Sequence, residues 1–305
     1  MKQTWIKRKM RWTRETIPFP HIKITDLPDL DPQSKAVKVW DRLVNCLAWE
    51  FGDGEKWVLR GARKESYKLE SALDRGIERR IDSGINQQTA EDYLLKQFKR
   101  AAHHFLESCM VPDKKDRLEW LALMQHYGAP TRLLDFTRSP YVACFFAMEE
   151  GNIEDDRAIW AINSKWLVDK SFPHIKKKLA PDKRDMKKSD LLDSNFIAQH
   201  FDAIFTKNTV PLILPVEPPR SNPRLLVQQG LFLCPSVAEK GFITNLSAFS
   251  DDVKRMQDSV CKIVINHHIR TEALSELNLM NINSASLFPD LSGFASSLGH
   301  KLEWI

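Results

Sequence analysis

The chain has 305 residues, of which 43% are hydrophobic and 28% are charged. This composition is ordinary for a globular protein and excludes a wholly disordered or fibrous chain. The 45 Lys and Arg residues against 40 Asp and Glu residues give a formal net charge of +5, too small to indicate a nucleic-acid partner by itself. The length fits roughly two domains of ordinary size or one larger α/β domain.

Apolar runs and cysteines limit the cellular location. The longest apolar run, Tyr141 to Met148, is far shorter than the ~18 residues that a membrane span needs. The basic N-terminus is not followed by the apolar core of a secretory signal. We therefore expect a cytoplasmic protein without a membrane partner, a disulfide framework or a metal site. The cysteines are widely spaced: Cys46, Cys109, Cys144, Cys234 and Cys261.

In chain order, residues 1–35 are basic and rich in proline, which predicts an extended arm. Apolar residues at helical spacing then predict helices over residues 32–48, 89–108, 113–127 and 140–150. Short apolar runs between them predict strands over residues 57–61 and 131–136.

The second half begins with a predicted strand over residues 157–162. Residues 172–188 are dense in lysine and predict a solvated insertion loop, with a phosphate-contacting patch as the alternative. Beyond them we expect a helix over 191–205, strands over 209–216, 225–234 and 260–265, and helices to the C-terminus. Because helices and strands mix without strict alternation, the fold class predicted is α+β. The domains expected are an arm (1–35), a core (36–245) and a C-terminal strand and helical extension packed on the core (246–305).

The densest group of polar residues surrounds the predicted strand at Leu133–Leu134. Asp135, Thr137 and Ser139 follow it, where the strand leads into an apolar helix. Such a junction exposes backbone N–H groups and hydroxyls that can hold an anion or a sugar. The alternative is that Ser139 or Thr137 only caps the helix.

Three further residues precede the same strand: His126, Tyr127 and Arg132. Helix capping alone does not explain their clustering beside Asp135. Two structural interpretations stay open, a His126 that is satisfied within the fold and an ion pair between Arg132 and Asp135.

The sequence Trp57-Val58-Leu59-Arg60-Gly61 resembles the opening of the FRG domain family, named for a Phe-Arg-Gly tripeptide. Residues 126–147 resemble the central block of that family. Arg224, Gln228, Gly230 and Phe232 resemble its later block, and residues 287–294 resemble its end. The chain departs from the family pattern at two positions. Leu59 replaces the usual aromatic residue, and Ala62 replaces a common glutamine.

The order of these motifs is similar to that of ADP-ribosyltransferases. That likeness implies a mixed or antiparallel split-sheet core and NAD as substrate. Arg60 would anchor the NAD, with Gly61, Arg132, Thr137, Ser139 and Gln229 lining its pocket. Arg60, His126, Tyr127, Asp135 and Gln228 would form the catalytic set.

Gln228 stands where a transferase of this kind has a glutamate. It can hold a ribose hydroxyl, but it supplies no charge to an oxocarbenium-like transition state. Alternative carboxylates are Glu217 and Asp135, whereas Glu149 and Glu150 are expected to be solvated at a helix end.

Three classes of function follow. The first is an ADP-ribosyltransferase or NAD glycohydrolase that acts as a bacterial toxin or phage-defence effector, with a protein or nucleic acid as a possible acceptor. The second is a catalytically silent module that binds a nucleotide or nucleic acid. The third is a nuclease that uses Asp135 and a histidine, although the spacing shows no metal cluster for it.

Overall fold

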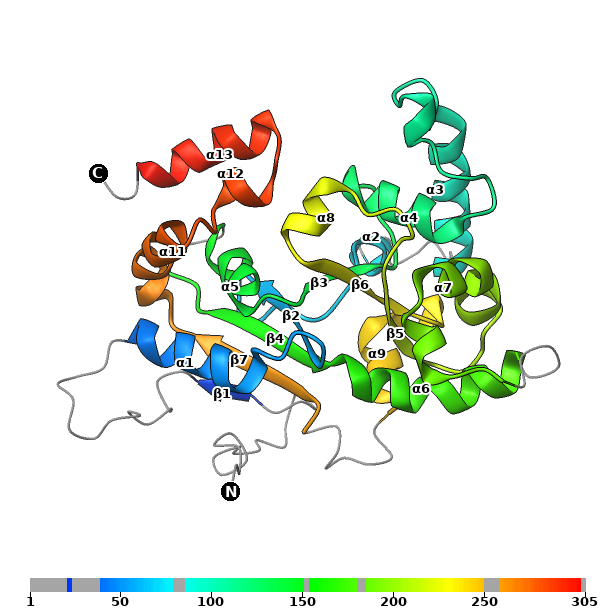
Figure 1. Cartoon of the computed structure of the whole chain (residues 1–305), viewed down its shortest axis with the longest axis horizontal. Helices are drawn as coiled ribbons and strands as arrows, with labels where there is room; N and C mark the ends of the chain where they lie inside the picture. The colour runs from blue at the N-terminus through cyan, green and yellow to red at the C-terminus, as the bar shows by residue number, and fades with distance from the viewer. Residues whose placement is uncertain are drawn as a thin grey trace.

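A computed structural model describes residues 21–23, 39–78, 86–150, 154–179, 185–249 and 258–302 of the chain. Seven strands in this part form one sheet in the order β1-β7-β4-β2-β3-β6-β5 (Figure 1). β1 runs parallel to β7, and every other neighbouring pair is antiparallel. The strands are β1 (His21–Lys23), β2 (Trp57–Ala62), β3 (Leu134–Thr137), β4 (Arg157–Asn163), β5 (Ile213–Val216), β6 (Gly230–Pro235) and β7 (Val260–Ile265).

Helices cover both faces of the sheet, which confirms the α+β class. The longer helices are α1 (Val39–Phe51), α2 (Ala72–Glu78), α3 (Gln87–Ala102), α4 (Arg117–His126), α5 (Pro140–Met148), α6 (Ser164–Leu179), α7 (Ser194–Phe201), α9 (Gly241–Ser247), α11 (Arg270–Leu279) and α13 (Leu291–Lys301). Shorter pieces are η3 (Ser108–Met110), η4 (Lys188–Leu192), the π-helical η5 (Asp202–Thr206), α8 (Pro223–Val227), η6 (Ala238–Lys240), η8 (His267–Ile269) and α12 (Ser284–Leu287). No helix in the described part of the chain combines the length and the apolar character needed to cross a bilayer.

The strands in the middle of the sheet are buried on both faces. Along β4, Ile159 and Ala161 pack into one hydrophobic cluster with α1, α5 and α11, while Trp160 and Ile162 pack into a second cluster on the other face. This alternation follows from the two-residue period of a strand. A strand with apolar residues on both faces has no solvated side, so each face needs its own layer of helices.

The sheet is divided between β2 and β3. Their register joins only Leu59 with Thr137. On its other edge β3 pairs with β6 over its whole length, and the Arg138 N–H donates to the Gln229 carbonyl at 3.0 Å. Because backbone groups alternate along a strand, Thr137 and Asp135 turn their carbonyls toward β2. β2 does not continue the ladder beyond Leu59, and this division of the sheet positions the candidate site.

Several predicted boundaries are wrong. The helix expected over 89–108 ends at Ala102, and the strand expected from 131 begins at Leu134. The predicted strand 225–234 is a short helix, α8, followed by a strand from Gly230. Pro223 at the first helical position and the Asn222 side chain, which accepts the Leu225 N–H at 2.8 Å, start that helix.

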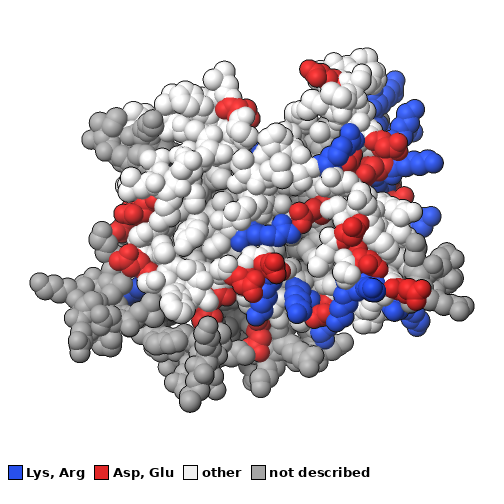
Figure 2. All heavy atoms as spheres, viewed as in Figure 1, with Lys and Arg blue, Asp and Glu red and all other residues white. Residues whose placement is uncertain are grey.

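The lysine-rich segment 172–188 was expected to be a loop, but it continues α6 to Leu179. Residues 180–184 lie outside the described residues. Ile175, near the C-terminal end of α6, is buried in the core, and this apolar contact overrides the effect of the surrounding lysines. Lys176 donates to the Met186 carbonyl at 3.2 Å, and Lys188 pairs with Asp169 at 2.6 Å. Figure 2 shows acidic and basic side chains interspersed on this face, without a continuous basic patch.

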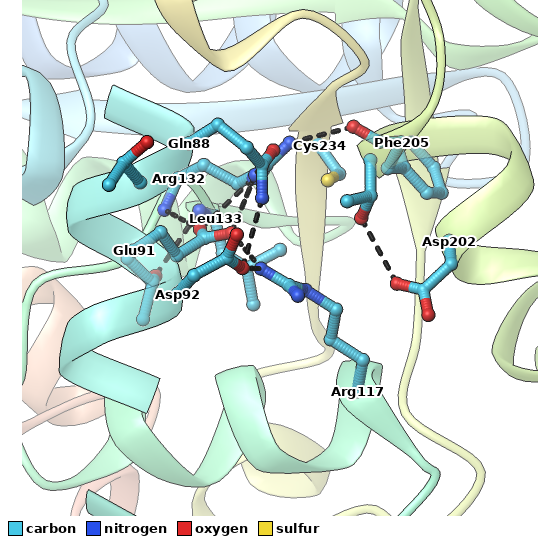
Figure 3. A network of polar contacts seen from close by, with 12 residues as sticks. Gln88, Glu91, Asp92, Arg117, Arg132, Leu133, Asp202, Phe205 and Cys234 are labelled. Atoms are coloured by element: carbon cyan, nitrogen blue, oxygen red, sulfur yellow. Dashed lines mark hydrogen bonds and ion pairs between the residues drawn. The ribbon is translucent and has the colours of Figure 1, made fainter. Parts of the chain in front are cut away.

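A buried ion pair fixes the start of β3 (Figure 3). The guanidinium of Arg132 donates from Nε to both carboxylate oxygens of Glu91, at 3.0 and 2.9 Å, and a second nitrogen reaches Oε2 at 2.6 Å. A third nitrogen donates to the Phe205 carbonyl at 2.9 Å. Burial raises the pKa of Glu91, but the charges of Arg132 and Arg117 outweigh it and hold the pKa below its ordinary value. The pair therefore ties α3 to β3 and to the end of η5.

We expect Glu91→Gln to lower the free energy of unfolding by about 3–5 kcal/mol, because it leaves the buried Arg132 charge uncompensated. Denaturant titration at neutral pH measures the loss. Asp92→Asn is the control, since this half-exposed partner of Arg117 is worth at most about 1 kcal/mol. Because the folded pKa of Glu91 is depressed, its contribution is present above the unfolded pKa and is lost as the pH falls through the folded value. Equal losses in the two variants would contradict this role.

Candidate functional site

A cavity of about 890 Å³ opens where β2 and β3 diverge. Its walls come from the ends of these strands, from the segment 63–70 after β2, and from α5, α8 and α13. Five cationic residues and four carboxylates line it: Arg60, Arg63, Lys68, Arg75, Arg224, Glu70, Asp135, Glu149 and Glu150. The site is therefore polar and charged, with segments distant in sequence brought together by the sheet.

Arg60 lies in the gap between the two halves of the sheet. Its guanidinium donates to the backbone carbonyl of Asp135 at 2.7 Å and lies 3.7 Å from the Asp135 carboxylate. Burial lowers the pKa of Arg60 and the Asp135 charge opposes that shift, so an arginine stays protonated here. The side chain is 26% exposed, and this part faces the cavity. Arg60 thus joins β2 to β3 and presents a positive charge to a ligand.

The other cations differ in how far they are neutralised. Arg63 forms an ion pair with Glu150, and Lys68 lies 3.6 Å from Glu70. Arg75 donates to the Glu70 backbone carbonyl at 2.7 Å, and the Arg224 guanidinium lies 4.4 Å from the centre of the Phe288 ring. Neither Arg75 nor Arg224 forms an ion pair with a carboxylate among the described residues. These two charges, with that of Arg60, make the cavity suited to an anion.

Gly61 shapes the wall by its lack of a side chain. A Cβ atom there would lie 2.2 Å from the Ala143 carbonyl oxygen and 2.5 Å from the Ala147 nitrogen. Any larger residue would push α5 away from β2. Gly61 therefore allows α5 to pack closely against β2. It also lines the cavity, as the sequence predicted.

Thr137 and Ser139 have defined structural partners. The Thr137 hydroxyl donates to the Gln228 carbonyl at 2.7 Å and accepts the Ser139 N–H at 3.0 Å. The Ser139 hydroxyl accepts the Val142 N–H at 3.3 Å and so caps α5. Thr137 lines the cavity, whereas Ser139 does not. Ser139 therefore acts as the N-terminal cap of α5, which is the alternative considered from the sequence.

Gln228 lines the cavity but is largely buried. Its side-chain amide donates to the Leu287 carbonyl at 2.9 Å, which joins the turn before β6 to α12. Its neighbour Gln229 is exposed, adopts a positive φ of 47° and does not line the cavity. In this structure Gln228 is a positioning residue for the C-terminal helices that close one side of the cavity.

We expect Gln228→Leu to loosen α12 and α13 without unfolding the sheet, because it leaves the Leu287 carbonyl without its donor at a cost of about 1–3 kcal/mol. Amide hydrogen exchange should then rise over residues 284–302 and stay unchanged over β4 and β7. Gln229→Leu, at the exposed neighbour, is the matched control. Uniform protection in both variants would contradict the positioning role.

Asp135 lies in the cavity with its carboxylate 58% exposed. It accepts a hydrogen bond from the Gln125 amide at 2.8 Å. His126 and Tyr127 end the preceding helix, and their rings meet edge to face with centres 4.9 Å apart. Neither ring lines the cavity. Burial and then the Arg224 charge lower the pKa of His126, while Asp290 opposes them.

Arg132 is separate from this group. Its side chain is 1% exposed, does not line the cavity, and is engaged by Glu91 and the Phe205 carbonyl. The ion pair considered between Arg132 and Asp135 is therefore wrong, because Glu91 takes the place of Asp135. The sequence did not signal this partner, since 41 positions separate the two residues.

Glu149 was expected to be solvated, but it is half-buried and lines the cavity. The Ser284 hydroxyl donates to its carboxylate at 3.1 Å. A carboxylate at the C-terminal end of a helix is disfavoured by the helix dipole. Arg270 offsets this by donating to the backbone carbonyls of Met148 at 2.9 Å and Glu149 at 3.2 Å. By contrast, Glu217 pairs with Arg138 and lies outside this cavity.

No group of three His, Cys, Asp or Glu side chains in the described part of the chain is arranged to hold a metal ion. The nuclease hypothesis relied on Asp135 and a histidine. His126, the histidine among the predicted site residues, does not line the cavity that holds Asp135.

Residues 55–156 match the model of the FRG domain family. The chain carries an FRG domain. No curated protein and no solved structure matches the chain. The FRG domain supplies β2, β3 and α5, and with them Arg60, Asp135 and Glu149. Arg224, Gln228 and the C-terminal helices, which complete the cavity, come from beyond the matched residues.

Proposed function

We propose that the cavity binds NAD or a related nucleotide and that the protein cleaves the bond between nicotinamide and ribose, as an ADP-ribosyltransferase or an NAD glycohydrolase. The observation that carries this proposal is the presence of Arg60, Arg75 and Arg224 in one cavity with a half-buried carboxylate, Glu149. The order of the FRG motifs, similar to that of ADP-ribosyltransferases, also supports it.

The size and charge of the cavity suit a dinucleotide. Its volume of about 890 Å³ lies within the range of about 300–1,000 Å³ of small-molecule and cofactor sites. Guanidinium groups bind phosphate oxygens through paired, charge-assisted hydrogen bonds. Trp160, Phe288 and Tyr67 also line the cavity and offer ring faces or edges to a base.

Cleavage of the nicotinamide–ribose bond develops positive charge on the ribose, and a nearby carboxylate stabilises it. At ~4 Å and an effective dielectric constant near 20, that attraction is worth about 4 kcal/mol. This corresponds to roughly a thousandfold in rate. Gln228 carries no charge, and the Asp135 carboxylate is 58% exposed, so that solvent screens its charge. We assign the role to Glu149, which the Ser284 hydroxyl orients.

The bond breaks with its electron pair leaving on the nicotinamide nitrogen, which becomes neutral. Water, or a hydroxyl or amine of an acceptor, then forms the new bond to the ribose carbon and releases one proton. The side chains of the cavity hold the diphosphate and stabilise the cationic ribose. Release of NAD-derived nicotinamide in a cell depletes NAD, which is the action proposed for a toxin or phage-defence effector.

We expect the purified chain to release nicotinamide from NAD, and Arg60→Ala to weaken NAD binding at least about tenfold through the lost charge-assisted hydrogen bonds. Chromatography of free nicotinamide and calorimetric titration measure the two effects. Arg100→Ala, at an exposed arginine of α3 outside the cavity, is the control. Absence of release, with and without cell lysate as acceptor, would overturn NAD consumption. Retained NAD binding in that case would support the silent binding module.

Glu149→Gln separates chemistry from binding, because glutamine keeps the size of the side chain and can accept the Ser284 hydrogen bond. We expect the rate of nicotinamide release to fall roughly a thousandfold while NAD affinity changes only a few-fold. Glu150→Gln, at the adjacent and exposed carboxylate that pairs with Arg63, is the matched control. Similar rates in the two variants would remove Glu149 from the reaction.

A further inference from the structure

Attack of water or an acceptor hydroxyl on the ribose carbon releases a proton, so the proposed reaction needs a base in the cavity. Asp135 is a carboxylate of the cavity wall with a side chain that is 58% exposed. The exposure that screens its charge also lets a water molecule or a hydroxyl reach it. Asp135 is thus placed to take up a proton, a task different from the one assigned to Glu149.

The two carboxylate oxygens of Asp135 have different surroundings. Oδ2 accepts a hydrogen bond from the Gln125 side-chain amide at 2.8 Å and lies 3.7 Å from the Arg60 guanidinium. Among the residues that the structure describes, none donates a hydrogen bond to Oδ1. An ionised carboxylate accepts through both oxygens, so Oδ1 can take the proton of a bound nucleophile. One oxygen therefore fixes the side chain, and the other is left for the reaction.

The Gln125 amide is itself held in one orientation. Its carbonyl accepts the Thr131 hydroxyl at 2.6 Å, and the oxygen of that hydroxyl accepts the Leu133 N–H at 3.2 Å. Thr131 is fully buried, so the orientation is set from inside the fold. Because the Gln125 carbonyl is taken by Thr131, its NH2 group points to Asp135. This chain of hydrogen bonds fixes the rotation of the Asp135 side chain.

We propose that Asp135 is the general base of the reaction and that Gln125 is its positioning residue, an inference that rests on the proposed cleavage of NAD. Oδ1 of Asp135 takes the proton of water or of an acceptor hydroxyl while the oxygen forms its bond to the ribose carbon. The nicotinamide nitrogen leaves with the electron pair of the broken bond. The proton then passes from Asp135 to solvent. Glu149 stays ionised throughout and stabilises the positive ribose.

An ion pair with Arg60 alone does not account for the arrangement of Asp135. The shorter contact of Arg60, at 2.7 Å, is with the backbone carbonyl of Asp135, which any residue at this position would offer. A pair of charges 3.7 Å apart with a half-exposed carboxylate contributes little to stability. In inverting glycosidases, a carboxylate takes the proton of the water that attacks a sugar carbon in the same way.

Nicotinamide release by Asp135→Asn tests the proposal. Asparagine keeps the size of the side chain and can accept the Gln125 hydrogen bond through its carbonyl, but it is not a base. We expect kcat to fall roughly a hundredfold or more while KM for NAD changes only a few-fold. Gln125→Leu, which removes one hydrogen bond, should lower kcat about tenfold. Asp92→Asn, at a half-exposed carboxylate outside the cavity, is the matched control and should keep the wild-type rate.

Rescue by azide separates a base from a residue that only supports the fold. Azide is already an anion and attacks the ribose carbon without losing a proton, so it needs no base. We expect azide to raise nicotinamide release by Asp135→Ala at least about tenfold, with formation of an ADP-ribosyl azide. Azide should not restore Glu149→Gln, because that variant lacks the charge that stabilises the transition state.

The outcomes separate this inference from the proposed function. Wild-type rates in Asp135→Asn, or no effect of azide on Asp135→Ala, would rule out Asp135 as the base and leave NAD cleavage standing. An equal loss of kcat in Asp92→Asn and Asp135→Asn would also rule it out. A wild-type chain that releases no nicotinamide would overturn NAD consumption and the role of Asp135 together.

Discussion

The single register position shared by β2 and β3 determines the architecture of the cavity. If these strands paired along their whole length, the sheet would be closed where the cavity now lies. Instead the ladder stops after Leu59 and Thr137, and the Arg60 guanidinium takes the Asp135 carbonyl that a strand amide would otherwise use. One side chain thus replaces part of a β-ladder. It satisfies a backbone acceptor and leaves its remaining N–H groups for a ligand.

The parts around this gap have different tasks. Gly61 allows α5 to approach β2, which brings Glu149 at the end of that helix to the cavity. The buried ion pair between Arg132 and Glu91 fixes the start of β3, the strand on the other side of the gap. The FRG domain provides these elements, whereas α8, α12 and α13 close the site from outside the matched residues. A charged cavity in a fold of this kind needs such rigid support, because unpaired cations close together repel one another.

The sequence predicted the α+β class, the FRG motifs and most of the long elements, because hydrophobic periodicity and Gly or Pro breaks are local signals. The strand 260–265 was predicted to the residue. Local signals failed where contacts between residues distant in sequence determine the structure. The many lysines of α6 made the segment look solvated although Ile175 is buried in it. Nothing in the sequence around Arg132 indicated that Glu91 is its partner. The small residues Gly61 and Ala143 are consistent with a close approach of α5 to β2, and this approach brings the end of α5, with Glu149, to the cavity.

The position of β7 has a consequence for how the chain is made. This strand lies between β1 and β4, although it comes from residues 260–265 and β1 from residues 21–23. During synthesis, β1 has no neighbour in the sheet until the ribosome has added more than 230 residues after it. The edge of β4 likewise stays unpaired until then. Completion of this side of the sheet must therefore wait for a late segment, and until it emerges the exposed edge of β4 is open to pairing with other chains.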